Sequence, residues 1–380
     1  MSAPITPSVT SDRAPGFRLN RIATPLVLIA GMLLITLFTV VRGNEVFDRV
    51  VTVMFINLLL AVGLQMFMGN SGLGSFGQYA FVTIGAYASI WFSLTPKQKK
   101  VALPDMPEEW WLFNQHQSFL VAILIAAAIA TVLGALIGIP LVRLRGASFT
   151  IATFALLIVV NRVALQWQEL TRGARTVLGI PKFTDIWVVF IWAAIAVIVA
   201  HAFKESPIGL KLRASREDED AAVSLGVNAA LMRWGAWTIC AFFSGVGGAL
   251  WAHFIQQFSP HNFYLKETFL VVAMLIIGGS GSVSGAVIGA VVVALVQEQL
   301  RQFEIWIDFQ RTDQTWFGQL IPIDARGFAE VVVAIAFILV LAWRPAGITG
   351  GREITLNTFR RAKQMVTRAA PTEVRAPLGE

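Results

Sequence analysis

The chain has 380 residues, of which 56% are hydrophobic and only 14% are charged, whereas soluble domains carry roughly a quarter charged residues. The single cysteine, Cys240, and four histidines exclude a disulfide framework and a cysteine-rich metal centre. The net charge of +7 fits basic residues that anchor a membrane surface better than a nucleic-acid interface. The composition therefore predicts an all-α polytopic membrane protein with no nucleic-acid partner.

Apolar runs long enough to cross a bilayer, about 20 residues each, recur along the chain. They lie at 22–41, 50–68, 72–94, 118–141, 147–168, 184–203, 232–256 and 327–343. The apolar stretch 267–300 is too long for one span, and the segment Gly278 to Gly285 interrupts it. We expect two short helices there, joined either by a tight turn or by a broken helix whose freed backbone groups line a cavity. The total is about ten transmembrane segments.

Both chain termini are predicted to be cytoplasmic. Basic residues precede the first apolar run, and no signal-peptide cleavage site follows it, so 22–41 is predicted to be an uncleaved anchor helix. The C-terminal segment is also strongly basic, as cytoplasmic segments of membrane proteins are. We expect three regions: a cytoplasmic N-terminal segment at 1–21, a transmembrane domain at 22–343, and a basic cytoplasmic tail at 344–380.

The same topology places the longest polar segments between spans. It puts 204–231 in the cytoplasm and both 95–117 and 301–326 outside. Within the inner segment, Arg216 to Val223 has helix-forming composition, and Gly226 stands where a helix can end. Taken alone, such a segment fits a solvated helical connector.

The order of residues in this inner segment gives it a second interpretation. It contains a Gly-x-x-x-Arg-Ala-x-Arg-Glu-x-Glu-x-Ala-Ala pattern followed by Leu-Gly, which resembles the cytoplasmic coupling loop of ABC importer permeases. That loop inserts a short helix into a groove of the ATPase subunit, so the resemblance implies a separate ABC ATPase that binds and hydrolyses ATP. The residues implied in coupling are Gly209, Arg213, Arg216, Glu217, Glu219, Ala221, Ala222 and Gly226.

Further motifs in the same order resemble the branched-chain amino acid (Liv-type) permease family. They include Gly72 to Phe81 with Gly85-Ala86-Tyr87, Arg143 to Gly146, and Gly278 to Gly285, and the match spans about 50–345. The resemblance implies the ABC importer permease fold, a second permease subunit, a periplasmic solute-binding protein and the lipid of the bacterial inner membrane. It implies import of a branched-chain amino acid or a similar small polar solute, with urea and amides as open alternatives.

Polar side chains inside apolar spans are candidates for a translocation path, because buried amides and charges need partners or water. Hydrogen bonding between helices is the alternative for each of them. Arg162 has Glu298 and Gln297 as plausible partners. The candidate path residues are Gln78, Tyr79, Asn161, Arg162, Ser280 and Ser282.

Catalytic chemistry is not indicated. The segment Gly72 to Gly77 matches Gly-x-Gly-x-x-Gly but lacks the flanking strand and acidic residue of a dinucleotide site, so it favours close helix packing. No phosphate-binding loop, catalytic triad or metal-ligand spacing occurs in the sequence, so we expect no enzyme activity, cofactor or metal in this chain. An ion-coupled secondary transporter is the alternative function, disfavoured by the shortage of carboxylates within the spans.

Overall fold

The computed structural model describes residues 16–312, 327–344 and 346–353. Within these residues the fold is built from helices, and an isolated β-bridge joins Val177 and Phe258. The helices are α1 (Gly16–Arg42), α2 (Glu45–Leu64), η1 (Gln65–Gly69), α3 (Gln78–Ser93), α4 (Pro96–Ala102), η2 (Trp111–Asn114), α5 (Phe119–Leu141), α6 (Gly146–Gln166), α7 (Gln168–Thr171), α8 (Ile186–Glu205), α9 (Pro207–Glu217), α10 (Glu219–Ser224), α11 (Ala229–Ile255), η3 (Pro260–Phe263), α12 (Leu265–Gly278), α13 (Val283–Thr312) and α15 (Phe328–Trp343).

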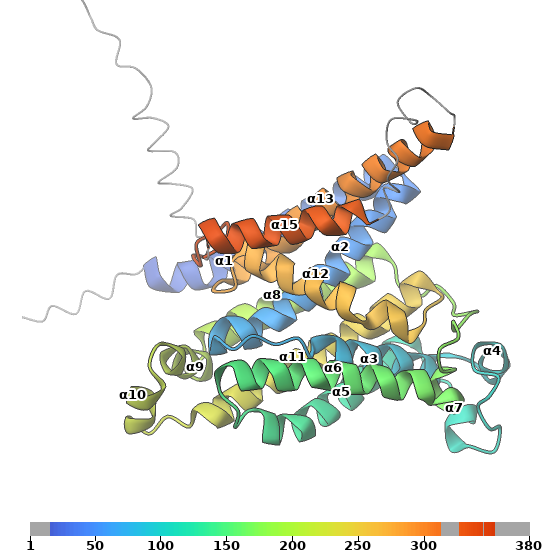
Figure 1. Ribbon diagram of the computed structural model, residues 1–380, viewed down its shortest axis with the longest axis horizontal. Coiled ribbons are helices and arrows are strands. Elements are labelled where there is room, and N and C mark those ends of the chain that lie inside the picture. The colour runs from blue at the N-terminus through green and yellow to red at the C-terminus, as the bar shows by residue number, and fades with distance from the viewer. Residues whose placement is uncertain (1–15, 313–326, 345, 354–380) are drawn as a thin grey trace, which may run out of the picture.

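The long helices run between two ends of the molecule (Figure 1). We call one the α9 end, since it carries α9 and α10, and the other the α4 end, since it carries α4, η2, α7 and η3. Eight helical segments in the described part of the chain are long and apolar enough to cross a membrane. The 16-residue helices α3 and α15 run between the same two ends. Together they account for the predicted total of about ten segments, and the fold is all-α as expected.

Two predicted boundaries were wrong. The span expected at 72–94 begins as a helix only at Gln78, because residues 72–77 are non-helical and open with Gly72 in the left-handed region (φ +73°). The stretch 267–300 forms two helices joined by a tight turn, but α13 has 30 residues and is not short. It continues to Thr312, so the first part of the loop expected at 301–326 is helical.

Small residues set the distances between the central helices. A side chain at Gly85 in α3 would collide with the backbone of Gly245 in α11, and one at Gly248 would collide with the carbonyl of Val82. On the other side of α11, Trp237 donates a hydrogen bond to the carbonyl of Gly134 in α5 (3.0 Å). Close approach through glycine is the usual way in which helices pack inside a bilayer.

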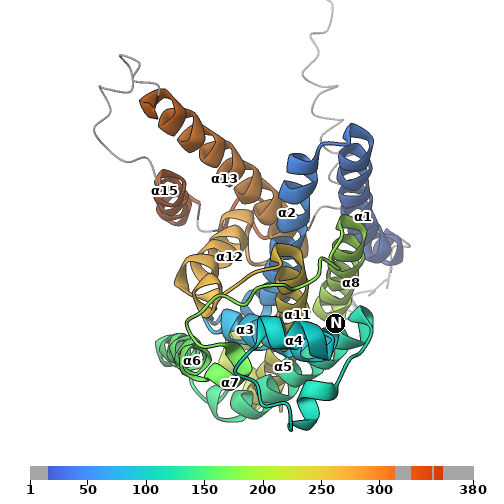
Figure 2. The same ribbon diagram turned by 90° about the vertical axis from the view of Figure 1, so that its right-hand side faces the viewer.

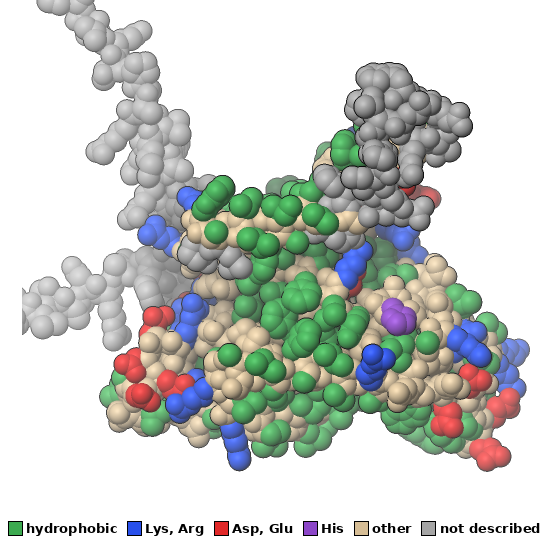
Figure 3. All heavy atoms as spheres, viewed as in Figure 1, with side chains coloured by type: hydrophobic (Ala, Val, Ile, Leu, Met, Phe, Trp, Pro, Cys, Tyr) green, Lys and Arg blue, Asp and Glu red, His purple; other side chains and the backbone are tan. Residues whose placement is uncertain are grey.

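The outer faces of the bundle are apolar between the two ends. In the view of Figure 3, Lys, Arg, Asp and Glu side chains gather toward the two ends, and hydrophobic side chains cover much of the surface between them. Helices α1, α5 and α6 leave most of their apolar residues outside the core, whereas α2 with η1 is 89% buried over its most apolar window. The bundle therefore has a lipid-compatible surface and α2 as its central helix.

Candidate functional site

The segment after α8 turns back at once and forms the α9 end. The Ser206 hydroxyl caps α9 by accepting a hydrogen bond from the Gly209 N–H (3.1 Å), and Pro207 occupies the first turn. Gly209 lies so close to the Phe203 carbonyl that a side chain there would collide with it. The absence of a side chain at Gly209 thus lets α9 fold tightly against the end of α8.

Two arginines attach α9 to the spans. Arg213 Nη2 donates to the carbonyl of Lys204 at the end of α8 (2.9 Å). Arg216 Nη1 donates to the carbonyl of Gly69 at the end of η1 (2.7 Å). Because carbonyls at a helix C-terminus have no partner within the helix, each guanidinium satisfies a carbonyl that the helix geometry leaves free. The predicted coupling segment is thereby linked to the central helix α2.

The next helix, α10, is also attached through a charge. Asp218 caps it by accepting from the Ala221 N–H (2.9 Å). Glu219 accepts a hydrogen bond from Arg233 Nη2 of α11 (2.7 Å), and Arg145 Nη2 lies 3.4 Å from the same carboxylate. The Arg233 hydrogen bond lowers the pKa of Glu219, and the charges of Arg233 and Arg145 act in the same direction against the opposing effect of burial. These two arginines therefore favour the ionised form of Glu219.

Some of the predicted coupling residues hold the segment in place, and the others are exposed. Gly209 and Ala222 are buried, while Arg213, Arg216 and Glu219 make the polar contacts just described. The other predicted residues are exposed, and so are the large apolar side chains of Val223 and Leu225, the latter 84% exposed. The exposed predicted residues are Glu217, Ala221 and Gly226. Gly226 adopts φ +78° directly after α10, which fits the predicted helix stop.

The turn between α12 and α13 is covered by residues 346–353, which we call the clasp. The Ile348 and Thr349 N–H groups donate to the carbonyls of Ile277 (2.9 Å) and Gly278 (3.1 Å) at the end of α12. At the other end of the clasp, Glu353 Oε1 accepts from the Val283 N–H (2.9 Å) at the start of α13. The clasp therefore satisfies backbone groups of both helix ends that meet at this turn.

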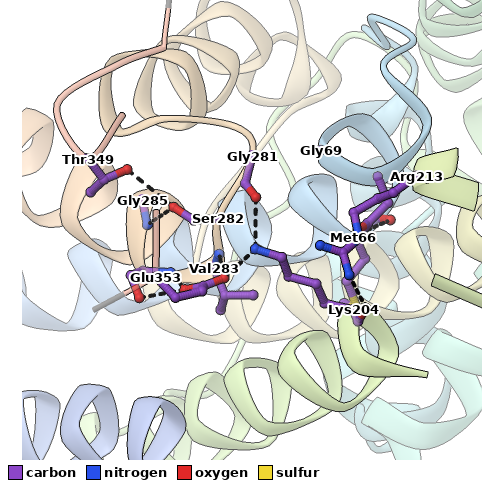
Figure 4. Close-up of polar contacts among 12 residues, drawn as sticks. Met66, Gly69, Lys204, Arg213, Gly281, Ser282, Val283, Gly285, Thr349 and Glu353 are labelled. Atoms are coloured by element: carbon purple, nitrogen blue, oxygen red, sulfur yellow. Dashed lines mark hydrogen bonds and ion pairs between the residues drawn. The ribbon is translucent and has the colours of Figure 1, made fainter. Parts of the chain in front are cut away.

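Lys204 joins the clasp to the predicted coupling segment, residues 204–231 (Figure 4). Its Nζ donates to Glu353 Oε1 (2.6 Å) and to the Gly281 carbonyl (2.8 Å), while Glu353 Oε2 accepts from the Ser284 N–H (3.0 Å) and hydroxyl (2.6 Å). Burial raises the pKa of Glu353, but the Lys204 charge and the hydrogen bonds from Lys204 and Ser284 outweigh it and lower the pKa below its usual value. One buried ion pair thus connects α8, the turn, α13 and the clasp.

This ion pair is not predictable from the sequence. The predicted topology put Lys204 at the start of the inner segment 204–231 and Glu353 in the basic tail expected at 344–380. The two residues are 149 positions apart, and no local pattern relates them. Residues 354–380 and 1–15 lie outside the described residues.

The candidate path residues are dispersed. Gln78 donates to the Leu60 carbonyl of α2 (2.7 Å), and Asn161 donates to the Pro260 carbonyl of η3 (2.9 Å), so both amides join neighbouring elements. Tyr79 is buried in α3. Ser280 and Ser282 lie in the turn at the α9 end, where Ser282 Oγ is 3.2 Å from Thr349 Oγ1.

Arg162 is exposed on α6. Of the two partners suggested for it, Glu298 was wrong, because this residue instead forms a two-pronged ion pair with Arg301 (2.7 and 2.9 Å) and accepts a third hydrogen bond from Gln302 (3.0 Å). Gln297, the other one, lines a cavity between α2, α12 and α13. The role of Arg162 stays a prediction.

A second polar region lies at the α4 end, between α2, α12 and α13. Figure 2 views the molecule from this end and shows α13 leaning away from α2 and α12. The opening contains a cavity of about 480 Å³, which falls in the size range of small-molecule sites. None of the six candidate path residues lines it. The polar residues that do are Arg49, Asn57, Glu267, Gln297, Glu298 and Arg301.

In the part of the chain that the structure describes, no three His, Cys, Asp or Glu side chains gather in a way that could hold a metal ion. The single cysteine, Cys240, is buried. Neither polar region contains an arrangement of nucleophile and base.

Comparison with known proteins gives the family. The model of the family described as "Branched-chain amino acid transport system / permease component" matches residues 46–342. The high-affinity branched-chain amino acid transport system permease protein LivM of Escherichia coli is 25% identical over 347 residues, which cover 82% of this chain and 71% of LivM. No solved structure matches.

The names of two other relatives refer to different solutes. The nucleoside ABC transporter permease protein NupC of Lactococcus lactis is 23% identical over 232 residues, covering 56% of this chain and 69% of NupC. The guanosine ABC transporter permease protein NupQ of Bacillus subtilis is 32% identical over 107 residues, covering 28% of this chain and 34% of NupQ. Since the family model covers most of the chain, this protein belongs to the branched-chain amino acid transport system permease family and is a non-enzymatic membrane component of an ABC transport system.

Proposed function

We propose that this chain is a permease subunit of an ABC importer, that it forms part of the path for a branched-chain amino acid or a similar small polar solute, and that a separate ATPase drives it through α9 and α10. The main support is the way in which these helices are attached. Arg216 links α9 to the end of the central helix α2, and Glu219 links α10 to α11. A force applied to the exposed side of α9 and α10 therefore reaches two long helices directly.

The exposed side of this segment has the character of a docking surface. Val223 and Leu225 present apolar side chains beside the charges of Glu217 and Asp220. In a chain with a lipid-facing surface between its ends, an apolar patch beyond the spans favours contact with protein. The occupant in this proposal is the ATPase subunit, which carries the ATP.

The proposed orientation puts the α9 end in the bacterial cytoplasm, with both termini on that side of the inner membrane. The positive-inside rule supports it, because Arg143, Arg145, Lys211, Arg213 and Arg216 all lie at the α9 end. The α4 end then faces the periplasm, where a solute-binding protein would deliver the solute. A second permease subunit would complete the path.

Co-purification in mild detergent tests the assembly. We expect the tagged full-length chain to recover a phosphate-loop ATPase and a second permease from its native membrane. Substituting Glu219→Ala together with Arg216→Ala should reduce recovery of the ATPase while leaving the second permease bound. Repeated recovery of the intact chain alone, under conditions that preserve another ABC complex, would contradict the proposal.

Uptake measurements test coupling. Glu217→Ala and Gly226→Ala should lower ATP-dependent uptake without preventing membrane insertion, since Glu217 is exposed and Gly226 adopts φ +78°, a conformation that alanine disfavours. Arg175→Ala, an exposed change at the α4 end, is the matched control. Uptake that survives ATP depletion but stops with an uncoupler would favour the ion-coupled alternative.

The solute is tested in membrane vesicles that contain the full transporter. The names of NupC and NupQ make nucleosides the competing solute class. We expect saturable uptake of labelled L-leucine, L-isoleucine or L-valine, with no competition by guanosine. Uptake of guanosine with no uptake of these amino acids would replace the amino acid assignment and leave the ABC permease assignment intact.

A further inference from the structure

The cavity at the α4 end changes in character with depth. On α2, Arg49, Val53 and Asn57 follow one another at four-residue intervals, so they lie on one face of the helix and lead from its start toward the middle of the bundle. On α13, Arg301 and Glu298 lie farther toward the α4 end, while Ala294 lies deeper. The mouth of the cavity is thus charged, and the section below it is largely apolar.

The charges at the mouth are not equally available. Arg301 and Glu298 satisfy each other through two hydrogen bonds, and Glu267 is engaged in an interaction of its own. Arg49 is exposed and has no hydrogen bond or ion pair with any residue in the described ranges. A guanidinium with no partner, at the mouth of a cavity, is well suited to bind a carboxylate through two parallel hydrogen bonds.

Asn57 gives a second, independent indication of a ligand. Its side chain is only 4% exposed, it lines the cavity, and its amide has no hydrogen-bond partner within residues 16–312, 327–344 and 346–353. A buried amide without a partner costs free energy unless water or a ligand satisfies it. An amide without a partner at this depth therefore indicates that the cavity admits water or a polar ligand and is not a packing defect.

We propose that this cavity is a solute-binding site within the single permease subunit and that Arg49 binds the carboxylate of the solute at its mouth. The apolar section by Val53 and Ala294 accommodates a hydrocarbon side chain. The inference rests on the proposed import of an amino acid. It adds the place of binding and the residue that distinguishes a carboxylate-bearing solute from a neutral one.

The test uses thiol labelling in right-side-out membrane vesicles that contain the full transporter. Cys240 is the chain's single cysteine and is buried, so a Cys240→Ala background accepts an Ala294→Cys reporter in the cavity wall. A membrane-impermeant maleimide should label the reporter, and L-leucine should slow that labelling. An Arg175→Cys reporter at the same end, outside the cavity, should be labelled equally fast with and without leucine.

Arg49→Gln then tests the assigned contact. We expect it to raise the leucine concentration needed for half-protection about tenfold, the equivalent of losing one charge-assisted contact. Protection by leucinol, which has the same side chain and ammonium group but no carboxylate, should change little. Arg175→Gln should leave both compounds unaffected.

The outcomes separate this inference from the proposed function. If Arg49→Gln leaves protection by leucine unchanged, or weakens protection by leucine and leucinol equally, Arg49 does not bind the carboxylate. A structural or lipid-binding arginine would not distinguish leucine from leucinol. Failure of leucine to protect Ala294→Cys while leucine uptake persists would overturn the site. Absence of leucine uptake in the parent transporter would instead overturn the proposed amino acid substrate.

Discussion

The helices α12 and α13 meet in two contrasting ways. At the α9 end they are packed through backbone: Gly289 in α13 lies against the Met274 carbonyl of α12, Gly278 lies against the Gly285 carbonyl, and the clasp covers the turn. At the α4 end the same helices separate around a cavity of about 480 Å³. The same helices are thus closely packed at one end and open at the other. We call the closely packed turn between α12 and α13, together with the clasp, the seal.

This contrast has a mechanical consequence. Contacts between glycines and carbonyls tolerate little sideways motion, whereas long polar side chains around a cavity can change rotamer. Arg216 and Lys204 connect the coupling segment to the sealed end and not to the open one. In the proposed function, movement of α9 would act first on the seal, as alternating access to a path between these helices would require.

The largest effect is expected from breaking the backbone contact that closes the seal. Gly289→Val would place a side chain against the Met274 carbonyl and the backbone of Gly278, and backbone atoms cannot yield by changing rotamer. We expect little folded chain to accumulate in membranes. Gly31→Val is the matched control, because a side chain at Gly31 in α1 meets no atom within 4 Å. Equal accumulation of the two variants would show that the helices at the seal are not tightly packed.

The next effect concerns the charge in the seal. Glu353→Ala leaves the Lys204 ammonium, whose side chain is 5% exposed, without its carboxylate, and breaking a buried pair costs about 3 kcal/mol or more. We expect a clear fall in the thermal unfolding midpoint of the detergent-solubilised protein. Lys204→Met combined with Glu353→Ala should recover part of the loss, because no buried charge is then left unpaired.

A surface ion pair gives the control for that measurement. Lys100 and Glu108 lie 2.6 Å apart, but their side chains are 57% and 65% exposed, so solvent screens their attraction. Glu108→Ala should leave the unfolding midpoint unchanged within error. A loss as large as that of Glu353→Ala would mean that burial does not decide the strength of the pair in the seal.

The sequence predicted the helices better than their contacts. Span number and the position of the turn follow from apolar runs and from glycines between Gly278 and Gly285, which are local features. The added length of α13 was missed because its polar residues after Leu300 interrupt the apolar pattern without interrupting the helix. Hydropathy measures preference for lipid, whereas helix continuation depends on backbone hydrogen bonds that polar residues form equally well.

The two polar regions were predictable to different degrees. The coupling segment is continuous in sequence, so its residues could be named together, although only the structure separates the attached Arg216 from the exposed Glu217. The cavity is lined by residues of three helices, among them Arg49 of α2, Glu267 of α12 and Glu298 of α13. One sequence does not state which helices are neighbours, so no spacing rule could bring these side chains together.

Filling the cavity at the α4 end should reduce transport without reducing the stability of the protein. Ala294→Phe would fill part of the cavity from the wall of α13, and the open space can accept the ring without displacing backbone. We expect uptake to fall about tenfold or more while the unfolding midpoint stays within a few degrees. Val292→Phe, on an exposed position of the same helix away from the cavity, is the control and should retain uptake. Full uptake by Ala294→Phe would show that solute does not enter this opening.

The smallest expected effect is the pH dependence of the seal. The pKa of Glu353 in the folded chain lies below its ordinary value of 4.5, so the folded state binds the proton of this carboxyl less readily than the unfolded state does. Its stabilisation is therefore complete above pH 4.5 and is lost as the pH falls through the lowered folded-state pKa. The difference in unfolding midpoint between the natural chain and Glu353→Gln should be constant from about pH 7 to pH 5 and shrink in more acidic solution. Subtracting the variant removes the contributions of other carboxyls, which titrate in both proteins. A difference that grows on acidification would mean that burial, and not Lys204, governs this carboxyl.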